Sequence, residues 1–414
     1  MRELRRVVVT GIGAVSPLGP DAESSWQAML AGRSGIGPIT LFDASGYPVR
    51  IAAEVKDFDP SRYLDHRTMR RSGRFAQMGV AACQEALCSG GLAVDESTRD
   101  DIGIVMASTG GVFIMGRQEE IIAQRGPDRV DPLLMPRLGP HMAAARVGRV
   151  LGVRGPNTTM NSACASGTDA LGHAFNLIRT GAADVLLAGG TEAIISPVGI
   201  ASMAVVGALT RSWNDEPQRA SRPFDAKRSG FVLGEGAGIL LLESEEYARR
   251  RRALILAELV GAGWSFDATD DTAPDVEGQT LAMVRALRSA GVRPEELSYI
   301  NAHGTSTELN DKTETAAIKR ALSEEVARRV PISSVKSMVG HLAAAAGGIE
   351  AVTCVQAIRD GVVAPTTNYE FPDPECDLDY VPNEARELKV DVVLSNSFGL
   401  GGQNAALILR RYAQ

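Results

Sequence analysis

Short apolar runs alternate with longer segments of helical spacing along the whole chain, and this alternation limits the fold more than any other feature. The runs at 7–9 and 240–242 contain only valine or leucine, and short continuous apolar runs are typical of buried strands. The longer segments repeat apolar residues at the spacing of a helix that buries one face. The sequence therefore predicts a layered α/β fold.

The alternation falls into two similar parts. Each part opens and closes on a strand and carries reactive residue types at strand ends, which suggests a duplicated half with its seam near residues 245–255. The length of 414 residues fits two domains or one large duplicated domain. We predict strands at 6–13, 101–106, 184–190, 237–243, 254–261, 297–303, 391–396 and 405–409, and helices at 22–31, 74–88, 168–179, 278–290, 312–327 and 343–360.

Charge and apolar content exclude several classes of partner. The chain has 43 Lys and Arg against 50 Asp and Glu, a net charge of −7. Proteins that neutralise nucleic-acid phosphates need a large basic surface, so we expect no nucleic-acid partner. No apolar stretch approaches the roughly 18 residues of a membrane helix, and the start of the chain lacks a secretory signal. We therefore expect a cytoplasmic protein without a membrane partner.

One of five scattered cysteines stands in an unusual setting. Cys164 lies in a run of small residues, 161–170, beside the helix predicted from 168, so a substrate has room to reach the sulfur. A helix start favours a thiolate and its free N–H groups can hold an oxyanion. A lone cysteine is more often a small buried hydrophobe. Because the cysteines are few, odd in number and scattered, we expect no disulfide framework, and because none forms a CxxC pair, we expect no metal site. We assign the buried role to Cys83, Cys88, Cys354 and Cys376.

Two further segments carry histidines among residues suited to catalysis. His303 ends an apolar run and precedes a glycine and several hydroxyl residues, so it stands at a strand end, where ligands bind in open α/β sheets. Lys336 lies five residues before His341, and a nearby cation keeps an imidazole neutral. Taken singly, each residue fits a structural role as well.

The last motif, residues 396–404, contains three glycines, which permit unusual backbone angles and a close approach to a ligand. By itself it also fits a hairpin turn. Glu192 follows two glycines and fits a buried helix cap. The remaining histidines have no reactive setting, and we interpret them as structural or surface residues: His66, His141 and His173.

These four segments, in this order, resemble those of the β-ketoacyl-acyl-carrier-protein synthases, in particular the elongating branch. The resemblance runs nearly end to end, from residues 9–13 to residues 401–404. It implies a duplicated thiolase-like fold layered α-β-α-β-α. The two halves would be 1–252, which holds the nucleophile, and 253–414, which holds the histidines and the lysine.

The resemblance also implies a role for each residue of the motifs. Cys164 matches the nucleophile that accepts the acyl group, His303 and His341 match the pair that flanks the malonyl group, and Lys336 sets the environment of the histidines. The supporting positions are Asp311 and Glu314 as an acidic pair, Thr305 and Thr307 on the pantetheine arm, and the N–H groups of Cys164 and Leu400 as an oxyanion hole. The peripheral positions are Thr109, Phe231, Phe398 and Leu400 at the acyl pocket and its gate, and Arg67, Arg70 and Arg71 as a patch for the carrier protein.

The implied reaction is a decarboxylative Claisen condensation. An acyl group held on Cys164 condenses with malonyl-acyl-carrier protein to give β-ketoacyl-carrier protein and CO2, in fatty acid chain elongation. The enzyme needs no cofactor of its own, because the phosphopantetheine belongs to the partner acyl carrier protein. The other implied partners are acyl and malonyl thioesters and a second subunit, in a homodimer or in a heterodimer with a sister ketosynthase-like subunit.

Three departures from the elongating pattern leave the pathway open. Leu400 replaces a phenylalanine that gates the acyl pocket, Gln403 replaces a threonine, and the sequence after His341 is LAAAAG. A type II polyketide or polyene ketosynthase with a Cys-less partner is therefore an alternative. The initiating branch and the thiolases fit less well, because the third position is His341 and the terminal loop has no cysteine. More distant alternatives are a non-catalytic scaffold and an acyltransferase or hydrolase that does not decarboxylate.

Overall fold

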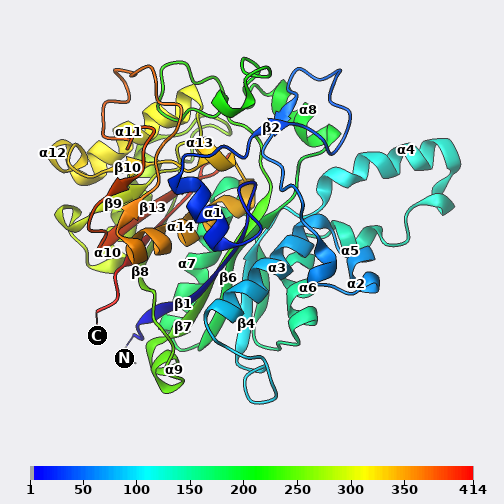
Figure 1. Cartoon of the computed structure of the whole chain (residues 1–414), viewed down its shortest axis with the longest axis horizontal. Coiled ribbons are helices and arrows are strands. Elements are labelled where there is room, and N and C mark those ends of the chain that lie inside the picture. The colour runs from blue at the N-terminus through cyan, green and yellow to red at the C-terminus, as the bar shows by residue number, and fades with distance from the viewer. Residues whose placement is uncertain (1–3, 414) are drawn as a thin grey trace.

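The computed structural model describes residues 4–413 and has a mixed sheet with helices on its faces (Figure 1). The sheet has ten strands in the order β10-β9-β13-β14-β8-β1-β7-β6-β4-β5, and the β1–β8 contact divides it into two halves of five. The first half contains β1 (Val7–Val15), β4 (Ile102–Ala107), β5 (Asn157–Met160), β6 (Val185–Glu192) and β7 (Gly236–Ser244). The second contains β8 (Ala257–Phe266), β9 (Tyr299–Asn301), β10 (Ile332–Ser333), β13 (Val392–Phe398) and β14 (Gln403–Arg410). Two short ribbons pair β2 (Gly37–Pro38) with β3 (Ile51–Ala52) and β11 (Val362–Val363) with β12 (Arg386–Glu387).

The two halves of the sheet have the same topology. When the strands of each half are numbered in chain order, both halves have the spatial order 3-2-4-5-1. In both halves strands 3, 2 and 4 are parallel, and strand 5 is antiparallel to its neighbours, strands 4 and 1. The chain therefore repeats one strand plan twice. The predicted division at 252/253 falls between α9 (Glu245–Arg250) and β8.

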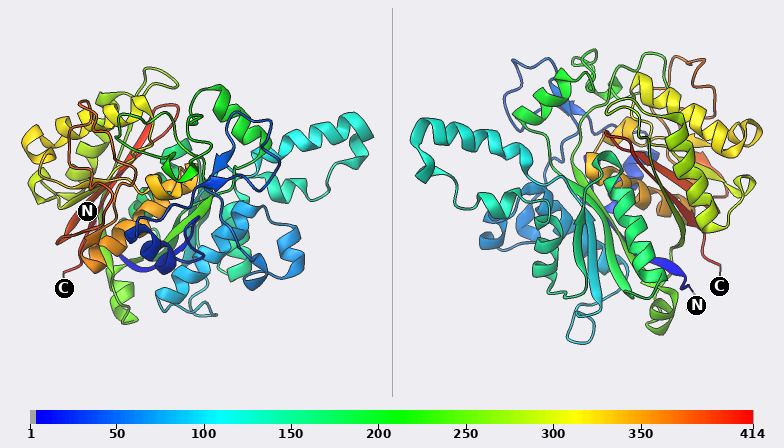
Figure 2. Two further views of the ribbon diagram at one scale, coloured as in Figure 1. Left: turned by 45° about the horizontal axis from the view of Figure 1, so that its top comes forward. Right: turned by 180° about the vertical axis from the view of Figure 1, so that it is seen from behind.

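Helices complete a five-layer arrangement of α-β-α-β-α. The first half carries α3 (Arg74–Ser89) and α6 (Met142–Leu151) on its outer face, and the second carries α10 (Val276–Ala290) and α11 (Glu308–Leu322). Between the halves lie α1 (Ala22–Leu30), α7 (Ser166–Arg179) and α14 (Ala346–Asp360). The other helices are α2 (His66–Arg70), α4 (Met115–Arg125), α5 (Leu134–Leu138), α8 (Pro197–Val205), α12 (Glu324–Ala327) and α13 (Lys336–Val339). The segment with α4 and α5 projects from the body of the molecule (Figure 2).

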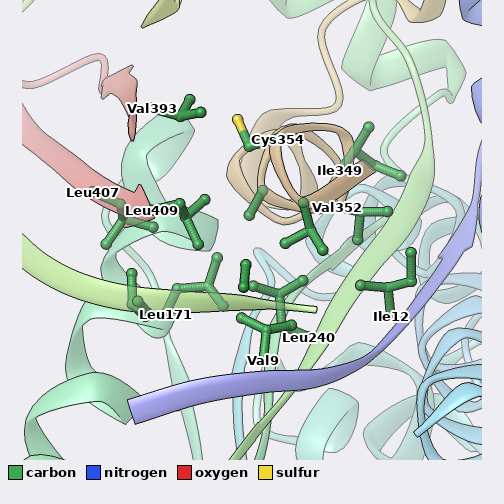
Figure 3. Packing of buried hydrophobic residues seen from close by; sticks show 14 of the residues in the cluster. Val9, Ile12, Leu171, Leu240, Ile349, Val352, Cys354, Val393, Leu407 and Leu409 are labelled. Carbon is green, nitrogen blue, oxygen red and sulfur yellow. The ribbon is translucent and has the colours of Figure 1, made fainter. Parts of the chain in front are cut away.

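The central layer contains the largest apolar cluster. Ile349 and Val352 of α14 pack in this cluster with Leu240 of β7 and Leu407 of β14 (Figure 3). Residues 346–358 of α14 are all buried, as predicted from its small and apolar residues. A helix that is buried on every side lies inside the protein, and α14 accordingly packs against strands of both halves, β7 and β13.

Most element positions agree with the sequence, and the differences have local causes. The helix predicted at 312–327 is broken at Ser323, whose φ of 76° ends α11 and whose side chain caps α12. The strand predicted at 297–303 ends at Asn301, so His303 lies beyond the strand end. Strand β5 was not predicted, because its four residues are at the sheet edge and are mostly polar. Within residues 4–413, every helix is too short or too polar to cross a membrane.

Candidate active site

Cys164 lies on a sharp turn between β5 and α7. The turn is the 3-10 helix Ala163–Ala165, and Ala163 has a φ of 51°, a conformation that L residues adopt at a cost of about 1–2 kcal/mol. The hydroxyl of Ser166 accepts the Ser162 N–H at 2.8 Å and donates to the Ala163 carbonyl at 2.6 Å, which closes the turn. The local sequence therefore presents the sulfur at the start of a buried helix. Of the four other cysteines, Cys83, Cys354 and Cys376 are buried as predicted, whereas the prediction for Cys88 is wrong: it is exposed, because it lies in the last turn of α3.

Burial raises the pKa of the Cys164 thiol, and this effect outweighs three groups that oppose it. The opposing groups are the Leu400 N–H, the Lys336 charge and the N–H of Cys164 itself. The expectation that the helix start lowers the thiol pKa is therefore wrong in its net direction, because desolvation penalises the thiolate more. The geometry still brings the Leu400 and Cys164 amides to one sulfur.

Two imidazoles lie beside Lys336. The rings of His303 and His341 have centroids 5.4 Å apart and are nearly perpendicular, at 85°. Burial lowers the pKa of both well below 6.5, and the Lys336 charge lowers both further. Both rings are therefore neutral at pH 7, as expected from the sequence.

Hydrogen bonds to Nδ1 fix which nitrogen of each ring carries the proton. Nδ1 of His303 lies 3.4 Å from Nζ of Lys336, and an ammonium can only donate. Nδ1 of His341 accepts the Ala343 N–H at 3.1 Å. Each ring therefore carries its proton on Nε2, so each can donate one hydrogen bond to a ligand.

Lys336 is held by two buried oxygen acceptors. Its Nζ donates to the His303 carbonyl at 2.6 Å and forms an ion pair with Glu350, and both side chains of the pair are 2% exposed. Glu350 was not singled out in the sequence. Apart from Cys354, it is the one ionisable residue in the stretch 343–358. A single carboxylate in a run of small and apolar residues is the feature of the sequence that could have identified it.

The two predicted acidic residues hold the backbone behind the site. Glu314 accepts the N–H groups of His303 and Gly304 at 2.8 and 2.7 Å, and burial raises its pKa to about 7. Asp311 accepts the N–H groups of Thr305 and Ser306 at 3.0 and 3.1 Å. Both carboxyls therefore fix the loop that follows β9, and neither is a solvated helix-start residue.

The remaining predicted residues surround this cluster or lie close to it. Thr305 and Thr307 share a hydroxyl hydrogen bond of 2.9 Å. The rings of Phe231 and Phe398 lie 5.0 and 5.7 Å from those of His341 and His303. Leu400 is 55% exposed at the tip of the glycine-rich turn between β13 and β14.

Thr109 is bound to a buried carboxyl. Its hydroxyl donates to Glu192 at 2.7 Å, so the hydroxyl is occupied within the protein. Burial raises the pKa of Glu192 to about 7, although the nearby N–H groups of Thr109, Ala193 and Ala344 each lower it. The interpretation of Glu192 as a helix cap is wrong, because the N-cap residues are Ser196 for α8 and Ala345 for α14, and Glu192 instead joins the end of β6 to the loop of Thr109.

The three predicted patch arginines lie together on α2 and directly after it. Arg67, Arg70 and Arg71 are all exposed. The guanidinium of Arg146 donates to the Arg71 carbonyl at 2.7 Å, and that of Arg137 donates to the Arg70 carbonyl at 2.8 Å. Arg146 is only 4% exposed and Arg137 pairs with Asp131, so these two residues support the backbone of the patch and do not enlarge the basic surface.

Known protein families match both halves of the chain. Residues 4–248 match the model of the β-ketoacyl synthase N-terminal domain, and residues 256–370 match that of its C-terminal domain. The chain belongs to the β-ketoacyl synthase family. This β-ketoacyl synthase is an acyltransferase of the condensing type, with the thiolase-like ketosynthase fold.

Relatives of this β-ketoacyl synthase come from two kinds of pathway. It is 48% identical over 99% of both chains to 3-oxoacyl-[acyl-carrier-protein] synthase 2 of Synechocystis sp.. It superposes on the ishigamide ketosynthase/chain length factor with a TM-score of 0.92 and 38% identity, over 99% of this chain and 100% of that one. It superposes with a TM-score of 0.90 and 33% identity, over 99% and 100%, on a type II PKS ketosynthase in complex with its acyl-carrier protein.

Proposed function

We propose that this β-ketoacyl synthase elongates acyl chains on an acyl carrier protein by decarboxylative condensation, with Cys164 as nucleophile. The observation that carries the proposal is the pair of neutral imidazoles, His303 and His341, each with Nε2–H as its free donor. Such a pair suits a reaction in which negative charge develops on a thioester oxygen.

The first half-reaction is acyl transfer. The Cys164 thiolate attacks the carbonyl of an acyl thioester, and the amides of Cys164 and Leu400 donate to the tetrahedral oxyanion. The C–S bond to the carrier then breaks, the carrier leaves as a thiol after taking up a proton, and the acyl group stays on Cys164. Because burial raises the thiol pKa, Cys164 gives up its proton only with the thioester bound, and that proton ends on the sulfur of the departing carrier.

The second half-reaction is decarboxylation and carbon–carbon bond formation. The malonyl thioester oxygen accepts hydrogen bonds from Nε2–H of His303 and His341, which stabilise the enolate as CO2 leaves. The electron pair of the broken C–C bond then forms the new bond to the acyl carbonyl, and Cys164 departs as thiolate. Lys336 keeps both imidazoles neutral, so that they donate hydrogen bonds and do not transfer protons.

The partner that delivers both thioesters is an acyl carrier protein, which also carries the phosphopantetheine; the enzyme itself uses no cofactor. The basic surface of Arg67, Arg70 and Arg71 fits an acidic carrier. Thr305 and Thr307 lie on the loop after β9, beside His303, and fit an amide-bearing pantetheine arm. No membrane or nucleic acid takes part, and the reaction takes place in the cytoplasm.

Fatty acid elongation is the pathway that the sequence relatives favour, at 48% identity for the Synechocystis protein. Polyketide or polyene synthesis is the second candidate, because Leu400 occupies the gate position and the solved relatives include an ishigamide ketosynthase. A leucine fills less space than a phenylalanine, so the gate would admit stiffer chains.

A second subunit joins this one at the edge of the sheet. Strand β5 is the outermost strand of its half, and an unpaired edge strand is a ready template for another chain. The partner is a second copy or a Cys-less sister subunit, and one solved relative is a ketosynthase/chain length factor.

Intact-protein mass spectrometry tests the proposal. The enzyme is mixed with saturated or polyene acyl carrier proteins and then with malonyl carrier, beside Cys164→Ala and the exposed-cysteine control Cys88→Ala. We expect an acyl adduct that Cys164→Ala abolishes and Cys88→Ala retains, followed by CO2 and a product two carbons longer. The best-loading chain identifies the pathway. Absence of an adduct with every donor would overturn the assignment of the nucleophile.

A further inference from the structure

Glu192 lies at the end of β6 and accepts hydrogen bonds from two separate segments. Its side chain is fully buried. It accepts the N–H of Thr109 at 3.0 Å, the hydroxyl of Thr109 at 2.7 Å and the N–H of Ala193 at 3.2 Å. The N–H of Ala344, in the turn that leads into α14, lies near this carboxylate and lowers its pKa. One carboxylate therefore ties β6 and the loop after β4 to the start of α14.

The turn that Glu192 holds is the one that orients His341. The Ala343 N–H, one residue before Ala344, donates to Nδ1 of His341 at 3.1 Å. Ala343 has a φ of 45°, so the turn needs outside contacts to keep this conformation. A second outside contact comes from the backbone of β6, which lies against the turn. A Cβ on Gly190 of this strand would be 2.3 Å from the Ala344 carbonyl oxygen.

We propose that Glu192 is a positioning residue for His341, acting through the strained turn at residues 343–344. With the turn in place, the Ala343 N–H occupies Nδ1 and the proton of the neutral ring stays on Nε2, toward the malonyl thioester. Without the turn, the proton exchanges between Nδ1 and Nε2 of His341. The Nε2–H donor to the enolate is then absent for part of the time. This inference rests on the malonyl role proposed for His341.

A carboxylate suits this position better than any neutral side chain. Three donors form hydrogen bonds with Glu192 and the Ala344 N–H lies near it, and the two oxygens of a carboxylate can face all of these groups. A glutamine accepts at one oxygen only, and its NH2 group would face a donor. The buried carboxyl is also costly, since burial raises its pKa to about 7, so its hydrogen bonds must hold it in place.

The test compares Glu192→Gln with a matched control, Glu85→Gln. Glu85 of α3 also accepts two backbone N–H groups, from Ala14 and Ala22, and burial likewise raises its pKa to about 7. Glu85 contacts β1 and α1 and no residue of the proposed site. The two half-reactions are measured separately: acyl loading of Cys164 by mass spectrometry, and CO2 release from malonyl carrier in a Cys164→Ala background. Melting temperature and ¹⁵N-histidine NMR complete the comparison.

We expect Glu192→Gln to slow CO2 release at least tenfold while acyl loading stays within twofold, and Glu85→Gln to leave the ratio of the two rates unchanged. The NMR signals of His341 should shift from the Nε2–H tautomer toward a mixture. If both half-reactions fall together with the melting temperature, or if CO2 release stays within twofold, the inference is wrong. A wild-type enzyme that releases no CO2 would instead overturn the proposed function.

Thr109→Val is the second variant, for use if the Glu192→Gln protein does not fold. Thr109→Val removes the hydroxyl donor to Glu192 and keeps the size of the side chain. CO2 release should then fall about threefold, and the tautomer signals should shift in the same direction. Unchanged CO2 release and unchanged signals in a folded Thr109→Val protein contradict the inference.

Discussion

At the scale of single residues, the site is organised around one buried cation. Lys336 contacts the ring and the carbonyl of His303, and its charge acts on His341 and on the Cys164 sulfur as well. Glu350 supplies the opposite charge. The protonation states of the nucleophile and of both imidazoles therefore depend on one ion pair.

The imidazoles of His303 and His341 should stay neutral from pH 8 down to pH 6. Their pKa values lie well below 6.5 because burial and Lys336 disfavour the charged ring. Histidine NMR, assigned with single-site variants, should show no titration of either ring in this range. The unfolded chain takes up these protons near pH 6.5, so both groups make the fold less stable as the pH falls below 6.5. A titration midpoint near 6.5 for either ring contradicts the prediction.

Replacing Glu350 with glutamine should destabilise the protein by about 3–5 kcal/mol, because it leaves a buried cation without a counter-charge. Urea unfolding measures the change. The control is Glu325→Gln, which removes a partner of Arg329 in an ion pair whose side chains are 85% and 62% exposed. That change should cost less than about 1 kcal/mol. Equal costs for the two variants would show that the buried pair is not needed for stability.

At the scale of elements, the starts of two buried helices must lie very close together. Both α7 and α14 follow a 3-10 turn that opens with an alanine of positive φ, Ala163 in the first half and Ala343 in the second. Gly167 and Gly348 let the two backbones meet, because a Cβ on Gly167 would lie 2.8 Å from the Gly348 nitrogen. The duplicated topology places Cys164 on one of these turns and Ala344 on the other.

Gly167→Ala should force α7 and α14 apart, since the new methyl group would meet backbone atoms that cannot rotate away. We expect a loss of about 1–3 kcal/mol in unfolding free energy and slower acyl loading of Cys164, three residues away. Gly46→Ala is the control, because nothing lies within 4 Å of its Cβ, and its effect should stay within about 0.5 kcal/mol. A stable and fully active Gly167→Ala enzyme would show that the helices can separate at no cost.

At the scale of the whole molecule, three exposed arginines, Arg67, Arg70 and Arg71, lie together on a chain of net charge −7. The pKa of Arg146 is lowered by burial and by the charges of Arg149 and Arg71, which shows how close these cations lie. An acidic partner would gain from this surface despite the overall negative charge, because steering depends on the local field.

Replacing Arg67, Arg70 and Arg71 together with glutamate should raise the KM for carrier-bound substrates by about tenfold or more at low salt. The kcat for a small acyl thioester without a carrier should not change. The control replaces three exposed arginines of α10 and the turn after it: Arg285, Arg288 and Arg293. Steady-state kinetics at two salt concentrations gives the comparison, and an equal rise in KM for both triple variants would exclude a specific carrier surface.

The sequence by itself determined the layered fold and the residue types of the site. Both are local properties: the period of apolar residues distinguishes strand from helix, and the motifs around Cys164, His303 and His341 keep their order whatever the packing. Only the tertiary structure decided the direction of the Cys164 pKa, the pairing of Lys336 with Glu350 and the hydrogen bond of the buried Arg146 to the Arg71 carbonyl. These depend on burial and on partners far apart in the chain, because the free energy of a charge is set by everything that surrounds it in the fold.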